Sequence, residues 1–130
     1  MVKIRASCEI IGDQFSPTIF ASISHVLLKN AHDPGEIGKE GRFKGKPIPY
    51  GSASIAVSEI AEEDWARFDD LISVLETCGS ALWQAGADDV TLRCSLFHDG
   101  QCNFEFSRKQ LARIAALKVD LAISSYCEEK

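Results

Sequence analysis

The chain has 130 residues, of which 45% are hydrophobic and 25% are charged. These proportions are typical of a globular protein and exclude an intrinsically disordered one. Lysine and arginine number 14 against 19 aspartate and glutamate residues, so the formal net charge is -5. Because an acidic surface repels phosphate backbones, general nucleic-acid binding is disfavoured. We expect one folded domain over residues 1–130.

The first predicted strand runs from Val2 to Ile10, where apolar and polar side chains alternate. Alternation with a period of two is typical of a strand with one buried face. This stretch has no continuous apolar core of the kind a signal peptide needs. No segment of the sequence reaches the roughly 20 apolar residues that span a bilayer. We therefore expect a cytoplasmic protein without a membrane segment.

A short helix and a long loop are predicted next. Ser16 suits a helix cap and Pro17 the first helical position, and apolar residues follow at helical spacing through Leu27. Residues 29–51 are then rich in glycine and proline, which predicts an irregular loop without regular elements. Loops of such length are uncommon in compact domains and are often functional or mobile.

A strand over residues 53–57 precedes the longest predicted helix, which ends before Gly86. Acidic residues 62–64 stand where a helix N-terminus favours negative charge. The apolar residues that follow recur at helical spacing and predict the main core element: Trp65, Phe68, Leu71, Ile72, Leu75, Leu82 and Trp83.

A β-hairpin is predicted in the last third of the chain. Residues 90–96 alternate as a strand, Asp99 and Gly100 form a two-residue turn signal, and residues 102–106 alternate as the returning strand. A third helix follows, and a last strand is predicted over residues 119–123.

The third helix begins at Ser107, which forms a capping-box pattern with Gln110. The resulting order is strand, helix, strand, helix, strand, strand, helix, strand. It predicts an α+β fold: a five-stranded, mixed, mostly antiparallel sheet with three helices packed on one face.

This order of elements resembles the uncharacterised bacterial domain-of-unknown-function family 4279 over the whole chain. The resemblance rests on the first strand ending at Gly12, the helix start Ser16-Pro17, the segment 41–47 and the run 104–126. It implies a fold and supplies no activity.

Catalytic and metal-binding patterns are sparse. The cysteines are odd in number and lack a Cys-x-x-Cys spacing, so we expect buried reduced thiols, as in the cytosol. His25, His32 and His98 show neither the spacing of a helical zinc site nor a nucleophile motif. A Cys–His pair joining His98 to Cys94 or Cys102 is the one catalytic alternative. We expect no enzymatic activity, no cofactor and no metal.

An acidic cluster at the start of the long helix is the first candidate binding site. Such a cluster can steer a basic partner protein, although helix N-terminal charge and a solvated face also account for it. Its candidate residues are Glu62, Glu63, Asp69 and Asp70.

A basic group in the glycine-rich loop is the second candidate. Pro47 stands where a phosphate-binding loop has serine or threonine, so nucleotide binding by that motif is disfavoured. The group could hold an anion or an acidic surface, or consist of solvated loop charges. Its residues are Lys39, Arg42, Lys44 and Lys46.

Together these features favour a protein-binding module without catalysis. The leading hypothesis is an immunity protein that neutralises a cognate bacterial toxin, possessing an acidic surface for a basic toxin domain. The alternative is a small-ligand or regulatory domain that binds an anion through the basic loop 35–51.

Overall fold

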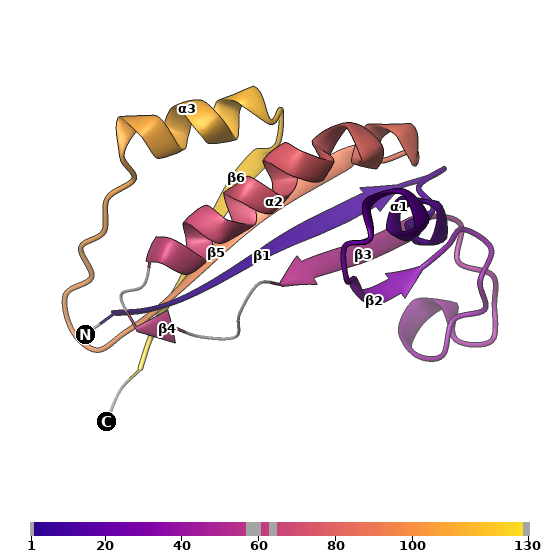
Figure 1. The fold of residues 1–130 in the computed structure, drawn as a ribbon. Coiled ribbons are helices and arrows are strands. Elements are labelled where there is room, and N and C mark those ends of the chain that lie inside the picture. Colours follow the sequence, from indigo (N-terminus) through magenta and orange to yellow (C-terminus); the bar gives the residue numbers. More distant parts are fainter. Residues whose placement is uncertain (1, 57–60, 63–64, 129–130) are drawn as a thin grey trace. The chain divides into compact units, whose positions relative to one another are not determined.

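Ten segments of regular structure follow one another in the part of the chain that the structure describes (Figure 1). The computed structural model describes residues 2–56, 61–62 and 65–128. Within them the segments are β1 (Val2–Gly12), α1 (Pro17–Ser24), β2 (Lys29–His32), the 3₁₀ turn η1 (Gly41–Phe43), β3 (Gly51–Ala56), β4 (Ala61–Glu62), α2 (Trp65–Gln84), β5 (Asp89–His98), α3 (Arg108–Ala116) and β6 (Asp120–Cys127).

The strands form one mixed sheet. Its main path has five strands in the order β2-β3-β1-β5-β6, and β4 pairs with β1 beside that path. The pairs β2–β3 and β1–β4 are antiparallel, whereas β5 and β6 are parallel. The predicted α+β class, with its mixed five-stranded path and three α-helices, is confirmed.

The predicted periodicities also identify the core. In β1 and β5 every second side chain is buried, and in α2 the buried side chains recur at helical spacing. Trp83, expected in the core, is 40% exposed. It directly follows the buried Leu82, and one residue turns a helix by about 100°, which places Trp83 beside the apolar stripe. The side chain of Trp65 lies outside the described residues. The described core residues of α2 are Phe68, Leu71, Ile72, Leu75, Cys78, Ala81 and Leu82.

Contacts group the chain into two compact units. Unit 1 comprises Met1–Cys8, Ala56–Thr77 and Thr91–Lys130, and unit 2 comprises Glu9–Ile55 and Cys78–Val90. Strand β1, helix α2 and strand β5 each contribute residues to both units.

The predicted returning strand over residues 102–106 is wrong. Gly100 has a positive φ angle of 85°, as the predicted turn requires, but residues 101–107 form no regular element. The side chains of this segment pack as an aromatic cluster instead: Phe106 lies 5.5 Å from Phe68 and 5.9 Å from Phe104, between ring centroids. β6 takes the place beside β5, where its register is continuous from Thr91↔Asp120 to His98↔Cys127.

The prediction that residues 29–51 contain no regular element is also wrong. Strand β2 pairs with β3 at Lys29↔Ser54 and His32↔Ser52, with a register shift between them. Asn30, with φ 52°, lies within that shift, and a left-handed residue is a common cause of such a bulge. The glycine and proline residues of this stretch are therefore compatible with a folded segment that contains a strand.

Helix α1 is shorter than predicted. Ser16 caps it and Pro17 occupies its first turn, as expected, but it ends at Ser24. His25 follows in the left-handed conformation, with φ 59°, and its N–H donates to the Ala21 carbonyl. Leu27, which was expected on the helix, lies in the segment that leads to β2.

Candidate functional site

The N-terminus of α1 is anchored within unit 2. The Ser16 N–H donates to the Ala85 carbonyl (2.9 Å), just after α2 ends. The Ser16 hydroxyl oxygen accepts from the Ile19 N–H (3.2 Å), which satisfies one of the helix's free donors. Helix α1 therefore starts at a fixed position, and the surface that it presents is fixed with it.

Asp33, just after β2, is a second anchor for the same helix end. Its Oδ1 accepts from the Ser16 hydroxyl (3.2 Å) and from the Thr18 N–H (3.1 Å). Partial burial acts to raise the pKa of the Asp33 carboxyl, but the hydrogen bonds from Thr18 and Ser16 and the nearby His32 together hold it below its ordinary value. The Asp33 N–H in turn donates to a carboxylate oxygen of Glu36. The Glu36 side chain is thus held against the backbone of Asp33, whose own carboxylate anchors α1.

A cavity of about 300 Å³ lies at this junction, a volume at the small end of ligand-binding pockets. Its lining combines the carboxylate residues Asp33 and Glu36 with mostly apolar residues. The residues around it come from α1, the segment after it, and β2 with its following turn: Pro17, Thr18, Ala21, Val26, Leu27, Leu28, Ala31, His32, Asp33 and Glu36.

Exposed apolar side chains lie on α1 and in the segment after it. Ile19 and Ile23, one helical turn apart on α1, are 52% and 48% exposed. Leu27 is 83% exposed, and of these three residues it alone lines the cavity. We call Ile19, Ile23 and Leu27 the α1 surface. Exposed apolar side chains with polar neighbours are characteristic of interaction sites.

His32 connects the cavity to the glycine-rich loop. Its Nε2 is hydrogen-bonded to the Ser52 hydroxyl (2.8 Å), and its ring lies edge-on to Tyr50, 5.5 Å between centroids. Tyr50 contacts Phe43 in the same way at 6.0 Å, and the Arg42 guanidinium lies 5.4 Å from the Phe43 centroid. The Nδ1 atom of His32 is buried without a hydrogen-bond partner among the described residues. Such atoms are rare in folded proteins and are candidates for contact with a bound group.

The glycine-rich loop itself is ordered by its backbone. The Gly38 N–H donates to the Lys46 carbonyl, and the Gly45 N–H donates to the Gly38 carbonyl, both at 2.9 Å. Gly41 and Gly45 have φ angles of 70° and 74°, which L side chains rarely adopt. The turns are therefore possible because these residues are glycines.

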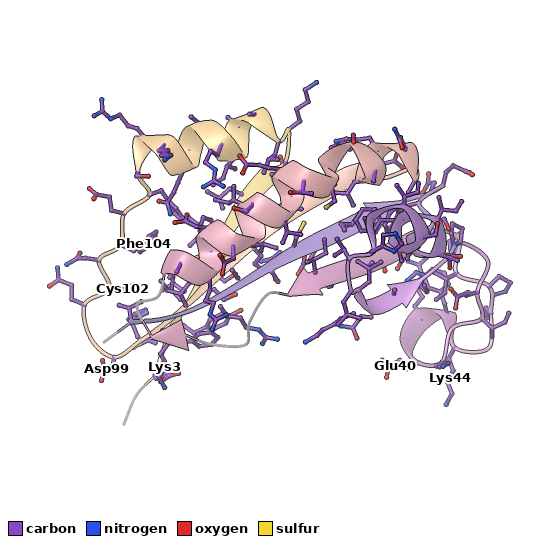
Figure 2. The ribbon with its side chains drawn as sticks, in the orientation of Figure 1. Lys3, Glu40, Lys44, Asp99, Cys102 and Phe104 are labelled. Atoms are coloured by element: carbon purple, nitrogen blue, oxygen red, sulfur yellow. The ribbon has the colours of Figure 1, made fainter. Side chains whose placement is uncertain are left out.

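This fold brings the predicted basic residues onto one short, exposed loop. Glu40 lies among them, and Figure 2 shows Glu40 and Lys44 pointing outward from the same turn. All four basic side chains are exposed: Lys39, Arg42, Lys44 and Lys46. They can meet an anionic surface, but the cavity lining does not include them.

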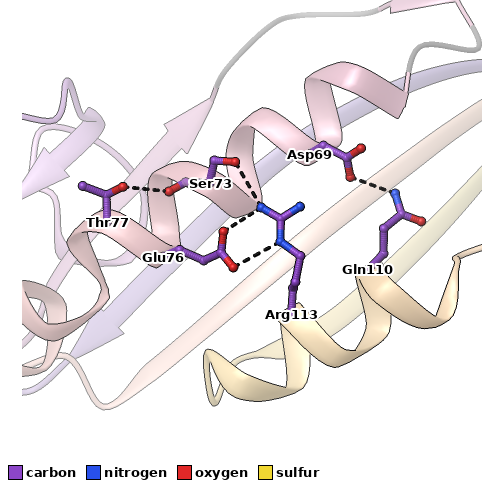
Figure 3. Close-up of polar contacts among 6 residues, drawn as sticks. All are labelled: Asp69, Ser73, Glu76, Thr77, Gln110 and Arg113. Atoms are coloured by element: carbon purple, nitrogen blue, oxygen red, sulfur yellow. Dashed lines mark hydrogen bonds and ion pairs between the residues drawn. The ribbon is translucent and has the colours of Figure 1, made fainter.

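The predicted acidic cluster is only partly described. Glu63 and the side chain of Glu62 lie outside the described residues. Asp70 is exposed. Asp69 accepts a hydrogen bond from the Gln110 amide (2.9 Å), so part of its hydrogen-bonding capacity joins α2 to α3 (Figure 3).

An ion pair extends that α2–α3 contact one turn further. The Arg113 guanidinium donates to both carboxylate oxygens of Glu76, at 2.6 and 3.1 Å, and to the Ser73 hydroxyl at 3.1 Å (Figure 3). Sequence reasoning did not identify this contact. The signal that could have found it is the spacing of Asp69 and Glu76 on one helix and of Gln110 and Arg113 on the other, because residues three or seven apart share a helix face.

The cysteines do not form the proposed catalytic pair. All five thiols are free, and Cys8, Cys78 and Cys94 are buried. Burial raises the pKa of the Cys94 thiol to about 11, which disfavours the reactive thiolate. Both ring nitrogens of His98 have other partners, the Gly100 carbonyl (2.9 Å) and the Ser125 hydroxyl (2.8 Å).

Metal-binding clusters and membrane-spanning helices are both absent from the described residues. No group of three or more histidine, cysteine, aspartate or glutamate side chains is placed to hold a metal ion. None of the described helices has the length and apolar character needed to cross a bilayer.

Comparisons of the chain with protein-family models, with curated proteins and with solved structures found no match. The resemblance to domain-of-unknown-function family 4279 therefore stays a prediction. The function has to be argued from the geometry of unit 2.

Proposed function

We propose that this chain is a non-catalytic protein-binding module that docks a basic partner against the α1 surface and its cavity. The observation that carries the proposal is that exposed Leu27 and the carboxylate residues Asp33 and Glu36 line the same cavity. An apolar side chain flanked by lysine or arginine fits it, because the apolar wall takes the first and the carboxylates attract the second.

Two further properties support this proposal. The formal net charge of -5 favours encounter with a basic protein. Three buried thiols, one with a strongly raised pKa, are consistent with a structural role for cysteine in a reducing compartment. We therefore propose a cytoplasmic immunity protein whose partner is a basic toxin domain.

The test is capture of the partner from cells by tagged protein, comparing the wild-type chain with Leu27→Asp. We expect one stoichiometric basic protein on the wild-type chain, lost as salt rises. Leu27→Asp should weaken its binding by about tenfold or more, because apolar anchors carry much of an interface's energy.

Leu111→Asp is the matched control, since Leu111 is also exposed (47%) but lies on α3 in unit 1. It should retain the partner. Equal binding by wild-type protein and Leu27→Asp would refute the α1 surface as the site. Loss of the partner from Asp70→Lys but not from Leu27→Asp would move the site to the acidic cluster of α2.

A second candidate function is anion binding by the basic loop. The observation in its favour is that the loop is folded and presents Lys39, Arg42, Lys44 and Lys46 together, with Arg42 placed against Phe43. Charge reversal by Arg42→Glu with Lys44→Glu should abolish binding of phosphate or of an acidic peptide, measured by calorimetry. Unchanged binding would remove this candidate, and partner capture that survives the same reversal would favour the α1 surface.

A further inference from the structure

Among the residues that the structure describes, strand β6 forms an open edge of the sheet. It stands last in the strand order, with β5 as its neighbour on one side. The Glu128 N–H donates to the His98 carbonyl (2.7 Å), which continues the β5–β6 ladder. Because backbone groups alternate in direction along a strand, the even-numbered residues of β6 face β5. The odd-numbered residues Leu121, Ile123 and Ser125 direct their backbone N–H and C=O groups away from the sheet.

This edge lacks the usual protection against pairing. The opposite edge, β2, is four residues long and irregular in register. β6 has eight residues in an unbroken register, and its sequence from Asp120 to Cys127 contains no lysine, arginine or proline. Natural edge strands usually carry such residues, a bulge or a short length, because an open edge is a template for another strand.

The strand is also complementary to itself. In an antiparallel pair centred on Ile123, Leu121 of one copy faces Ser125 of the other, so outward-directed groups meet outward-directed groups. Ile123 is 45% exposed and would meet its own copy. Lys118, just before β6, would approach Glu128, just after it, whereas a parallel arrangement would bring like charges together.

We propose that β6 is a dimerisation edge, which pairs antiparallel with β6 of a second copy of this chain, with Ile123 at the two-fold axis. A two-fold axis is the commonest symmetry of protein dimers, and it requires a self-complementary patch of this kind. The dimer continues the sheet from one copy into the next. The strand pairing itself uses β6, which belongs to unit 1, and no residue of the α1 surface.

The first test is the molecular mass of the full chain by sedimentation from low to high micromolar concentration. We expect a transition to twice the chain mass. Ile123→Lys should raise the dissociation constant about a hundredfold or more, because two ammonium groups would face each other at the axis. Leu111→Lys, at an exposed leucine of α3, should dimerise like the wild-type chain. A wild-type chain that stays monomeric, or an Ile123→Lys variant that still dimerises, overturns the proposal.

Residue-level amide exchange tests the register without a mutation at the axis. The N–H groups of Leu121, Ile123 and Ser125 should exchange more slowly as concentration rises, while those of Ala122 and Ser124 should be protected at all concentrations. Lys118→Glu should weaken the dimer, and Lys118→Glu combined with Glu128→Lys should restore it. Exchange of the odd-numbered amides that is independent of concentration overturns the proposal.

Discussion

The two units reach order by different physical routes. Unit 1 contains the aromatic cluster of Phe68 and Phe106, the α2–α3 polar contacts and the regular β5–β6 ladder. Unit 2 contains a short helix, a bulged four-residue strand and a loop ordered by backbone hydrogen bonds. Side-chain packing and pairing in regular elements stabilise the first unit. Residues with positive φ angles, such as His25 and Asn30, determine the turns of the second. The candidate site lies in the second, where regular elements are short.

Core truncations should have the largest effects and should show whether the units unfold together. Phe68→Ala in unit 1 and Phe20→Ala in unit 2 each remove a ring that is 0% exposed. Each should cost about 3–5 kcal/mol of unfolding free energy. Because β1, α2 and β5 run through both units, we expect one cooperative transition in urea. If the Phe20→Ala variant instead unfolded in two separate transitions in urea, with hydrogen exchange assigning each transition to one unit, the two units would not be cooperative.

Gly51→Ala should destabilise unit 2 through a steric clash with the backbone. A Cβ atom there would lie 1.7 Å from the Phe15 carbonyl oxygen, so the two segments would have to separate. We expect a loss of about 3 kcal/mol, measured by chemical unfolding. Gly79→Ala is the control, since a Cβ there meets no atom within 4 Å. Because alanine favours the α2 helix, it should stabilise by about 1 kcal/mol.

The two helix caps should give smaller and unequal effects. Ser107 and Gln110 form a reciprocal capping box at α3, and Ser107→Ala should cost about 1 kcal/mol. At α1, the Ser16 hydroxyl accepts from the Ile19 N–H and also donates to Asp33. Ser16→Ala removes both hydrogen bonds and should therefore cost more than Ser107→Ala when both are measured by thermal unfolding. A smaller loss at Ser16 would show that the hydrogen bond to Asp33 adds nothing to the cap.

The Glu76–Arg113 ion pair should contribute the least. The hydrogen bond from Arg113 lowers the pKa of the Glu76 carboxyl below the ordinary value of a glutamate. Since the folded-state pKa is the lower one, the stabilisation is present above about that value and is lost as pH falls through the lowered pKa. Glu76→Gln should slightly destabilise at neutral pH, and the difference from wild type should vanish in acid and shrink with salt. Glu105→Gln, at an exposed residue, serves as the control.

The sequence predicted unit 1 better than unit 2, and the reason is physical. Alternation in β1 and helical spacing in α2 report a buried face directly, and the Ser107 capping box located α3. The returning strand failed because Phe104 and Phe106 alternate like strand residues but pack as an aromatic cluster. Local periodicity cannot distinguish these outcomes, since the choice of β6 as the neighbour of β5 is a long-range one.

The candidate site was not predicted for a related reason. The sequence marked the charged residues, but the cavity depends on Asp33 anchoring the end of α1 and on the helix stopping at Ser24. Neither follows from spacing, because His25 adopts a left-handed conformation that a sequence pattern does not require. Leu27 was consequently assigned to a buried helix face, whereas it is 83% exposed.

The adjacency of β1 and β5 has a consequence for biosynthesis. These strands are neighbours in the sheet although residues 13–88 separate them along the chain. During translation β1 therefore emerges from the ribosome well before the strand that covers one of its edges, and pairings so distant in sequence form slowly. We therefore expect the thiol of Cys8, which is 0% exposed in the folded protein, to stay accessible to solvent until the sheet has formed.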